Sequence, residues 1–257
     1  MSSVLYELKD SVGHITLNRP DKLNSFNREM ALQLQAILDD CKKKEVRAVY
    51  ITGAGKGFSA GQDLAEVVDP NGPGMVKILS EHYNPIVTRI RKLEKPVVAA
   101  VNGVAAGAGA NIAFCCDIVV AAQSASFIQA FSKIGLIPDS GGTYTLPRLI
   151  GWQKASALMM LGDKVSATDA EKMGMIYKVL PDKNFVEESW TLAANLAKMP
   201  TRGLALTKKI LRMSFDSSFE EQLQDEDIFQ QQAAGTADYK EGVQAFLEKR
   251  LPNFKGE

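Results

Sequence analysis

The hydrophobic positions gather most densely in one uncharged stretch, the twenty residues 97–116. Its length would suit a membrane-spanning helix, but seven of these residues are alanine, three are glycine and none is leucine. The pair Asn102 and Gly103 is a turn signal that divides the stretch in two. The pattern therefore predicts a short buried strand over 97–101 and a small-residue helix that begins near Gly107. The start of such a helix offers unpaired N–H groups to a group that develops negative charge, and a tightly packed core helix is the alternative interpretation.

The remaining hydrophobic positions alternate between strand and helix periodicity. Val4, Tyr6 and Leu8 alternate with polar residues, as is typical of a half-buried strand. Beyond Gly151 the pattern is almost entirely helical. We predict strands over 4–8, 14–17, 48–52, 118–122 and 176–180, and helices over 27–43, 75–93, 182–198, 201–214, 218–234 and 237–250. This order predicts an α/β fold, with a core over residues 1–195 and a helical region over residues 196–257.

Composition and charge narrow the classes of function. The chain of 257 residues is 46% hydrophobic and 23% charged, which is typical of a soluble globular protein. Its 30 basic and 30 acidic residues balance, so neither a nucleic acid nor a membrane surface is an expected partner. The first residues lack the pattern of a signal peptide, and Cys41, Cys115 and Cys116 suggest buried, reduced thiols, so we expect a cytoplasmic protein. With only His14 and His82 available, neither a zinc site nor a histidine-based triad is expected.

Two glycine-rich segments approach known phosphate-binding motifs without matching them. Residues 107–112 have the first two glycines of a dinucleotide fingerprint, but Ile112 stands where the third glycine belongs. Residues 53–57 place a glycine after Lys56, where a Walker loop has serine or threonine. Nucleotide hydrolysis and hydride transfer are therefore not expected.

The segments 58–63 and 107–110 form a more informative pair, because each follows a predicted strand. In an open α/β arrangement, ligands bind at the carboxyl ends of the strands. Both segments would then present backbone N–H groups to one crevice. Two converging N–H donors make an oxyanion hole, which stabilises negative charge on a carbonyl oxygen.

Several longer segments resemble, in order and spacing, the signature segments of the crotonase superfamily, which includes enoyl-CoA hydratases and isomerases. They cover residues 18–26, 58–64, 98–118, 134–151 and 241–256. The resemblance implies a spiral of ββα units, followed by C-terminal helices that assemble a homotrimer or a homohexamer. It also implies acyl-CoA thioester substrates and no metal, flavin or nicotinamide cofactor, because coenzyme A enters as part of the substrate.

The resemblance extends to the catalytic positions. It implies that the backbone N–H groups of Gln62 and Ala108 hold the thioester oxygen. Family hydratases use two glutamates, and the matching positions here are Asn111 and Phe131, neither of which can exchange a proton. Family isomerases carry an aspartate where this chain has Asp139. One carboxylate suffices for isomerisation, because it can remove a proton at one carbon and return it at another.

Asp139 also has a structural interpretation, since aspartate before Ser-Gly-Gly-Thr is typical of a turn or a helix cap. In the catalytic interpretation, Phe131 makes the pocket apolar, which suits a ring substrate and raises the pKa of the carboxyl. The resemblance places the other substrate and CoA contacts at Lys22, Leu23, Ala60, Asp63, Leu64, Gly107, Asn111, Phe131 and Lys249.

We therefore expect an acyl-CoA isomerase. A general Δ3,Δ2-enoyl-CoA isomerase of fatty acid oxidation, or a hydratase-like enzyme, is the alternative within the family. A non-catalytic crotonase-like binding protein is the alternative from another class. Such a binder should lack the carboxylate or the glycines of the hole, and this chain has both.

Overall fold

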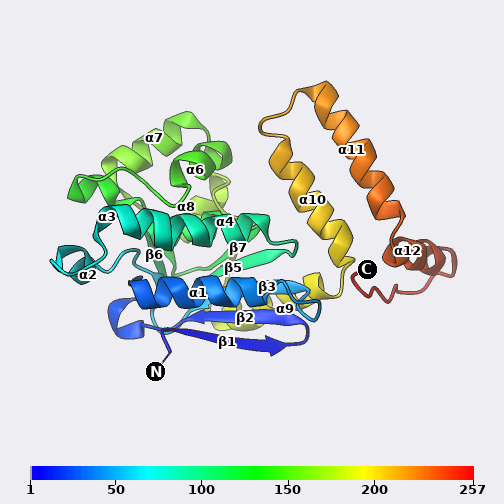
Figure 1. The fold of residues 1–257 in the computed structure, drawn as a ribbon, viewed down its shortest axis with the longest axis horizontal. Coiled ribbons are helices and arrows are strands. Elements are labelled where there is room, and N and C mark those ends of the chain that lie inside the picture. The colour runs from blue at the N-terminus through cyan, green and yellow to red at the C-terminus, as the bar shows by residue number, and fades with distance from the viewer. Residues whose placement is uncertain (1) are drawn as a thin grey trace.

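Two β-sheets form the centre of the computed structural model, which describes residues 2–257 (Figure 1). The strands are β1 Val4–Lys9, β2 Val12–Leu17, β3 Ala48–Gly53, β4 Gly57–Ser59, β5 Val97–Val101, β6 Val104–Ala106, β7 Ile118–Ala122, β8 Ser126–Ile128, β9 Lys164–Ser166 and β10 Lys178–Leu180. The larger sheet has the order β1-β2-β3-β5-β7-β10, and the smaller has the order β4-β6-β8-β9. The pairs β1–β2 and β8–β9 are antiparallel, and the other pairs are parallel.

Successive strands alternate between the two sheets. β3, β5 and β7 lie in the larger sheet, and each is followed directly by a strand of the smaller sheet, β4, β6 and β8. The first two of these pairs are followed by helices before the next pair begins. This arrangement is a succession of ββα units, and it aligns the carboxyl ends of β4, β6 and β8 at one edge because these neighbours run parallel.

Helices cover both sheets and form the end of the chain. They are α1 Arg28–Asp40, α2 Leu64–Val68, α3 Gly74–Lys77, α4 Asn84–Lys92, α5 Ala108–Phe114, α6 Gly142–Ile150, α7 Trp152–Leu161, α8 Ala167–Lys172, α9 Phe185–Ala197, α10 Thr201–Met213, α11 Phe219–Ala234 and α12 Ala237–Leu247. A π-helical turn, Ile78–Tyr83, joins α3 to α4, and a 3₁₀ helix, Ala130–Ile134, follows β8. Shorter 3₁₀ turns cover Pro20–Lys22 and Asp182–Asn184.

The uncharged stretch forms the centre of the core. Every residue of β5 and of α5 is buried. The small residues of α5 allow its close approach to β4: a Cβ on Gly109 would lie 2.5 Å from the carbonyl oxygen of Ser59. Such a contact is too short for any side chain, so glycine is required where helix and strand meet.

The C-terminal helices extend away from this core. α10 and α11 form a hairpin, and α12 with the C-terminal residues lies beyond its base (Figure 1). Lys208 of α10 attaches the hairpin to the core, since its Nζ lies 2.8 Å from Asp117 Oδ2. The same Nζ donates to the carbonyl oxygens of Ile90 at 2.8 Å and Lys95 at 3.1 Å. Burial lowers the pKa of Lys208, and the neighbouring Asp117 carboxylate opposes this shift.

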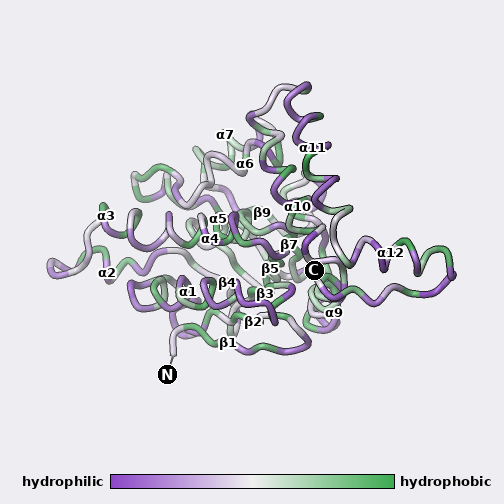
Figure 2. Tube along the Cα trace, turned by 45° about the vertical axis from the view of Figure 1, so that its right-hand side comes forward, coloured by the Kyte–Doolittle hydropathy of each residue, from purple (hydrophilic) through white to green (hydrophobic). Residues whose placement is uncertain are grey.

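Hydrophobic side chains remain exposed on the helical region of this single chain. Phe246, Leu247 and Leu251 are 83%, 69% and 90% exposed. The tube in Figure 2 shows hydrophobic positions along the outlying α12, next to the largely hydrophilic α11. Apolar surface of this kind is typical of a segment that is covered in an assembly.

The sequence predictions match the fold in its main elements. The α/β class is confirmed, and the strands predicted over 48–52, 97–101 and 118–122 correspond to β3, β5 and β7. The helix predicted over 75–93 is divided among α3, the π-helical turn and α4. The predicted turn before Gly107 is wrong in part, because residues 104–106 form β6. The predicted boundary after residue 195 falls within the last turn of α9.

Candidate active site

The two predicted hole donors follow neighbouring parallel strands. Gln62 lies shortly after β4, and Ala108 follows β6 as the first residue of α5. The segments touch at Gly61, where a Cβ would lie 2.9 Å from the carbonyl oxygen of Ala106 and 3.3 Å from the nitrogen of Ala108. Gly61 and Gly107 have φ values of 86° and 51°, in the region that favours glycine. These glycines therefore allow the peptide of Gln62 to approach the start of α5.

The backbone of Gln62 is fixed in direction by Phe26. The nitrogen of Phe26 donates to the carbonyl oxygen of Gly61 at 2.7 Å. The nitrogen of Asp63 donates to the carbonyl oxygen of Phe26 at 2.8 Å. Because successive N–H groups of an extended segment point to opposite sides, the N–H of Gln62 points away from Phe26. Within residues 2–257, neither this N–H nor that of Ala108 has a hydrogen-bond partner. Both donors are thus available to a ligand.

The side chain of Gln62 is held at both ends of its amide. Its Oε1 accepts from the hydroxyl of Tyr83 at 2.8 Å, and its Nε2 donates to Glu66 Oε2 at 3.0 Å. Glu66 in turn accepts from the backbone nitrogen of Arg28 through Oε1 at 2.8 Å. The sequence analysis assigned no role to Tyr83 or Glu66.

Asp139 lies in the loop between the 3₁₀ helix after β8 and α6. Burial raises the pKa of its carboxyl above the ordinary value, and the hydroxyl of Ser140, which donates to Oδ1 at 2.7 Å, opposes this shift. The carboxylate is not a helix cap: α6 begins after Gly141 without a side-chain cap, and Gly142 donates to the carbonyl oxygen of Asp139. The structure therefore contradicts the helix-cap interpretation, whereas the hydrogen bond from Gly142 to the Asp139 carbonyl confirms a turn at this position.

The two positions that carry glutamate in family hydratases have different roles here. Asn111 is fully buried; its Nδ2 donates to the carbonyl oxygen of Asp139 at 2.9 Å, and its Oδ1 accepts from Gln129 Nε2 at 2.8 Å. The amide therefore holds the backbone that carries the carboxylate. The ring of Phe131 lies 3.6 Å from the position of a Cβ on Gly107, so it forms an apolar wall beside the start of α5.

The predicted CoA contacts near the N-terminus lie together. The backbone nitrogen of Ala60 donates to the carbonyl oxygen of Leu23 at 2.9 Å. This bond brings the segment of Lys22 and Leu23 beside the loop of residues 60–63, which carries the predicted donor Gln62 and is called the hole loop below. Lys22, Leu23 and Leu64 are exposed. Asp63 has a structural role, since it pairs with Arg19 at 2.8 Å and accepts from the nitrogen of Ala65 at the start of α2.

Lys249 is not brought to this site within one chain. It follows α12, which lies at the opposite side of the molecule from α2 in Figure 1. Its assignment to the CoA phosphates of a neighbouring subunit stays a prediction.

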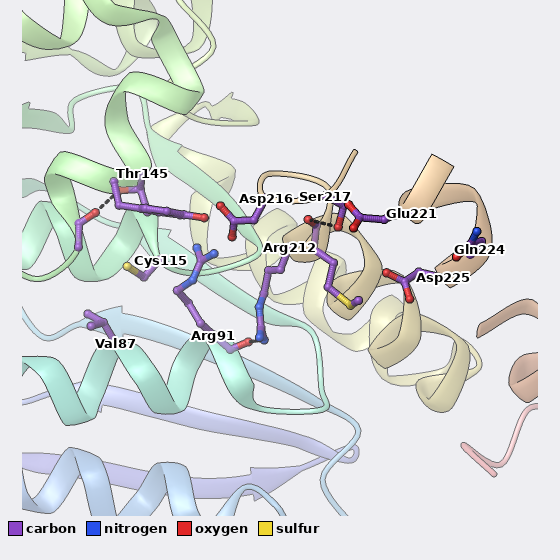
Figure 3. A pocket seen from close by; sticks show the side chains of 13 residues that line it. Val87, Arg91, Cys115, Thr145, Arg212, Asp216, Ser217, Glu221, Gln224 and Asp225 are labelled. Atoms are coloured by element: carbon purple, nitrogen blue, oxygen red, sulfur yellow. Dashed lines mark hydrogen bonds between the residues drawn. The ribbon is translucent and has the colours of Figure 1, made fainter. Parts of the chain in front are cut away.

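A cavity of about 830 Å³ lies elsewhere, between α4, α6 and the turn that joins α10 to α11 (Figure 3). Arg91, Arg212 and Asp216 are among its charged lining residues. Cys115, which follows the last residue of α5, also lines it, whereas Ala108 is the first residue of α5 and neither Ala108 nor Gln62 lines the cavity. The cavity is therefore separate from the paired N–H groups.

The described residues include no group of three or more His, Cys, Asp or Glu side chains that could hold a metal ion. The three cysteines are buried and unpaired, as predicted. No helix within residues 2–257 is long and apolar enough to cross a membrane.

Two backbone N–H groups without a protein partner among residues 2–257, and one half-buried carboxyl with a raised pKa, lie on a core of repeated ββα units. These are the groups needed to stabilise an oxyanion while a proton moves. A family model described as Enoyl-CoA hydratase/isomerase matches residues 7–257, and the chain belongs to this family, within the crotonase superfamily. It is an enzyme of the acyl-CoA isomerase or hydratase type.

Known proteins agree with this membership along the whole chain. The chain is 47% identical over 260 residues to the 1,2-epoxyphenylacetyl-CoA isomerase of Escherichia coli (strain K12), covering 100% of this chain and 99% of that protein. It is 41% identical over 254 residues to the probable enoyl-CoA hydratase of Rhodobacter capsulatus, covering 99% and 98%. The crystal structure of enoyl-CoA hydratase from Bacillus anthracis superposes with a TM-score of 0.92 at 33% identity, covering 99% of this chain and 100% of that one.

Proposed function

We propose that this enzyme isomerises an acyl-CoA thioester, and that its substrate is the ring epoxide 1,2-epoxyphenylacetyl-CoA, which it converts to oxepin-CoA in phenylacetate catabolism. The observation that carries the isomerase proposal is the placement of one protonatable group, Asp139, with Asn111 and Phe131 where two glutamates would serve hydration. The ring substrate is supported by the apolar wall of Phe131. It is also supported by the 47% identity to the enzyme of that name.

In this proposal, the thioester oxygen lies between the N–H groups of Gln62 and Ala108. The carbon–carbon bond shared by the epoxide and the six-membered ring breaks, and its electron pair becomes part of the double bonds of the seven-membered oxepin ring, which keeps the epoxide oxygen. Asp139 removes a proton from the carbon next to the carbonyl, and the negative charge moves onto the thioester oxygen. The two N–H groups stabilise that charge without titrating. Asp139 then returns the proton at a carbon of the oxepin ring, so substrate and product contain the same atoms.

A Δ3,Δ2-enoyl-CoA isomerase of fatty acid oxidation is the second candidate, because a single carboxylate beside an oxyanion hole serves that reaction equally well. We propose to distinguish the two by incubating the purified enzyme with each CoA thioester and separating the products by liquid chromatography with mass detection. The ring-epoxide proposal requires a higher kcat/KM for 1,2-epoxyphenylacetyl-CoA than for a linear 3-enoyl-CoA. The opposite order contradicts it, and no turnover of either thioester favours a non-catalytic binding protein.

We further propose a homotrimer or homohexamer in the cytoplasm, active without metal or organic cofactor. The exposed Phe246, Leu247 and Leu251 support the assembly, because their burial against a second copy would stabilise it. Sedimentation velocity at micromolar concentration tests the assembly, and a monomer would contradict it. Activity that survives exhaustive treatment with a chelator is the expected result for the cofactor proposal.

A further inference from the structure

Tyr83 makes a contact that the proposed reaction does not itself require. The reaction uses the backbone N–H of Gln62, yet the side-chain amide of Gln62 is held by the Tyr83 hydroxyl at 2.8 Å and by Glu66 at 3.0 Å. Only 21 residues separate Gln62 from Tyr83, and a loop with two short helices lies between them. The hydrogen bond therefore joins the hole loop to the end of the π-helical turn, directly before α4.

Tyr83 is itself rigidly placed. It is fully buried, and its ring lies edge-on to that of Phe26, with 5.9 Å between the ring centroids. Phe26 is also the residue whose backbone fixes the direction of the Gln62 segment. Tyr83 thus contacts the support of the hole twice, through its ring and through its hydroxyl. It is the last residue of a π-helical turn, a type of distortion that is frequent at functional sites.

The Tyr83 hydroxyl stays a hydrogen-bond donor. Burial raises the pKa of the phenol well above its ordinary value. The carboxylates of Asp139, Glu66 and Asp63 raise this pKa further, which places the hydroxyl in the electrostatic surroundings of both the hole loop and the proposed acid/base. A buried neutral phenol that donates to one acceptor has a fixed orientation, so it can hold the amide of Gln62 in one position.

We propose that Tyr83 is a positioning residue of the oxyanion hole, which acts by holding the Gln62 loop so that the Gln62 and Ala108 N–H groups point at one oxygen atom. This inference rests on the proposed function, since it assigns the hole a thioester oxygen. Tyr83 does not take part in proton transfer. Its effect is on the geometry of a donor, and small errors in such geometry reduce catalysis strongly.

The first test measures the polarisation of a bound carbonyl. Phenylacetyl-CoA labelled with ¹³C at the thioester carbon has no epoxide to react, and its carbonyl stretching band can be isolated by isotope-edited infrared spectroscopy. Wild-type enzyme is expected to shift this band to lower frequency, and Tyr83→Phe is expected to lose most of that shift. Tyr50→Phe is the matched control, because Tyr50 is 3% exposed and its hydroxyl lies 2.9 Å from Ser189 Oγ in a different part of the core. It should retain the full shift.

The second test is kinetic. Tyr83→Phe is expected to lower kcat on the order of tenfold with little change in KM, because ground-state binding does not depend on the aligned donor to the same extent. Gln62→Met keeps the backbone N–H but removes the acceptor of the same hydrogen bond. It should behave like Tyr83→Phe, and the double variant should be no worse than either single one. This second variant tests the hydrogen bond even where Tyr83→Phe fails to fold.

The outcomes separate the two proposals. If the wild-type enzyme shifts the carbonyl band and Tyr83→Phe shifts it equally, the positioning role is wrong, whatever its kcat. Additive losses in the double variant also contradict it. If the wild-type enzyme neither shifts the band nor isomerises a CoA thioester, the proposed function fails, and the role of Tyr83 fails with it.

Discussion

Replacing Asp139 by asparagine separates catalysis from structure at this position. The substitution keeps the shape of the side chain, and the new amide oxygen can still accept from Ser140, which donates at 2.7 Å in the wild type. No helix cap is lost, because α6 begins without a side-chain cap. The loss of a general base costs on the order of 100- to 10,000-fold in rate. The lower bound corresponds to about 2.7 kcal/mol of activation free energy.

The stability of the variant has an expected sign as well. Burial raises the pKa of Asp139 in the folded state, so ionisation of this carboxyl opposes folding once the pH is above that pKa. The neutral amide removes this cost. We expect Asp139→Asn to be at least as stable as the wild type at pH 7, and this advantage should disappear as the pH falls through the folded-state pKa.

Three measurements give the answer for Asp139→Asn. Product formation from the CoA thioester should fall by at least about 100-fold, while calorimetric binding of phenylacetyl-CoA is retained and urea unfolding shows no loss of stability. Asp163→Asn, at an exposed position, is the control that should leave all three unchanged. Turnover by Asp139→Asn at a near wild-type rate would refute the assignment of Asp139 as the acid/base.

Three further outcomes are expected. Ser140→Ala removes the hydroxyl that lowers the pKa of Asp139, so the acidic limb of the pH profile of kcat/KM should move to higher pH. If this limb does not move, Asp139 is not the titrating base. Asn111→Asp loses the donor to the Asp139 carbonyl and buries a carboxylate, so it should lower the free energy of unfolding by about 1–3 kcal/mol. It should not create an efficient hydratase of crotonyl-CoA, and efficient hydration would show that one added carboxylate is enough. Lys208→Met leaves the Asp117 carboxylate without its partner and should lower the free energy of unfolding, measured in urea, by about 3–5 kcal/mol. A negligible change would show that the ion pair does not attach α10 to the core.

The elements that the sequence predicts best are those with a single clear period. β5 and α5 follow from an apolar run divided at Asn102 and from the small residues after Gly107. β6 is harder to predict, because one valine and two alanines between two glycines are too few to show a strand period. α6 contains Pro147 within its helix, which weakens any helical signal there.

In the candidate site too, some roles can be assigned from local patterns and others cannot. The roles of Gln62, Ala108 and Asp139 can be assigned from the sequence because each residue lies in a motif with a recognisable local pattern, and these roles stay predictions. The roles of Tyr83 and Asn111 depend on partners that are 21 and 28 residues away in the chain, so no local pattern reveals them. A tyrosine before Asn-Pro is compatible with any helix start, and only the fold places its hydroxyl on the Gln62 amide.

The alternation of strands between the two sheets has a consequence for how such an enzyme can change its reaction. In the proposed reaction, the loops after β4 and β6 supply the paired N–H groups through the main chain, and the segment between β8 and α6 supplies the carboxyl through one side chain. Substitutions seldom delete a main-chain donor, whereas a single codon change replaces a carboxyl. Under the proposed function, activation of the thioester is thus less sensitive to substitution than the choice of proton acceptor, which depends on one side chain in a neighbouring loop. A protein engineer who wishes to alter the reaction should therefore diversify the segment after β8 and leave the first two loops intact.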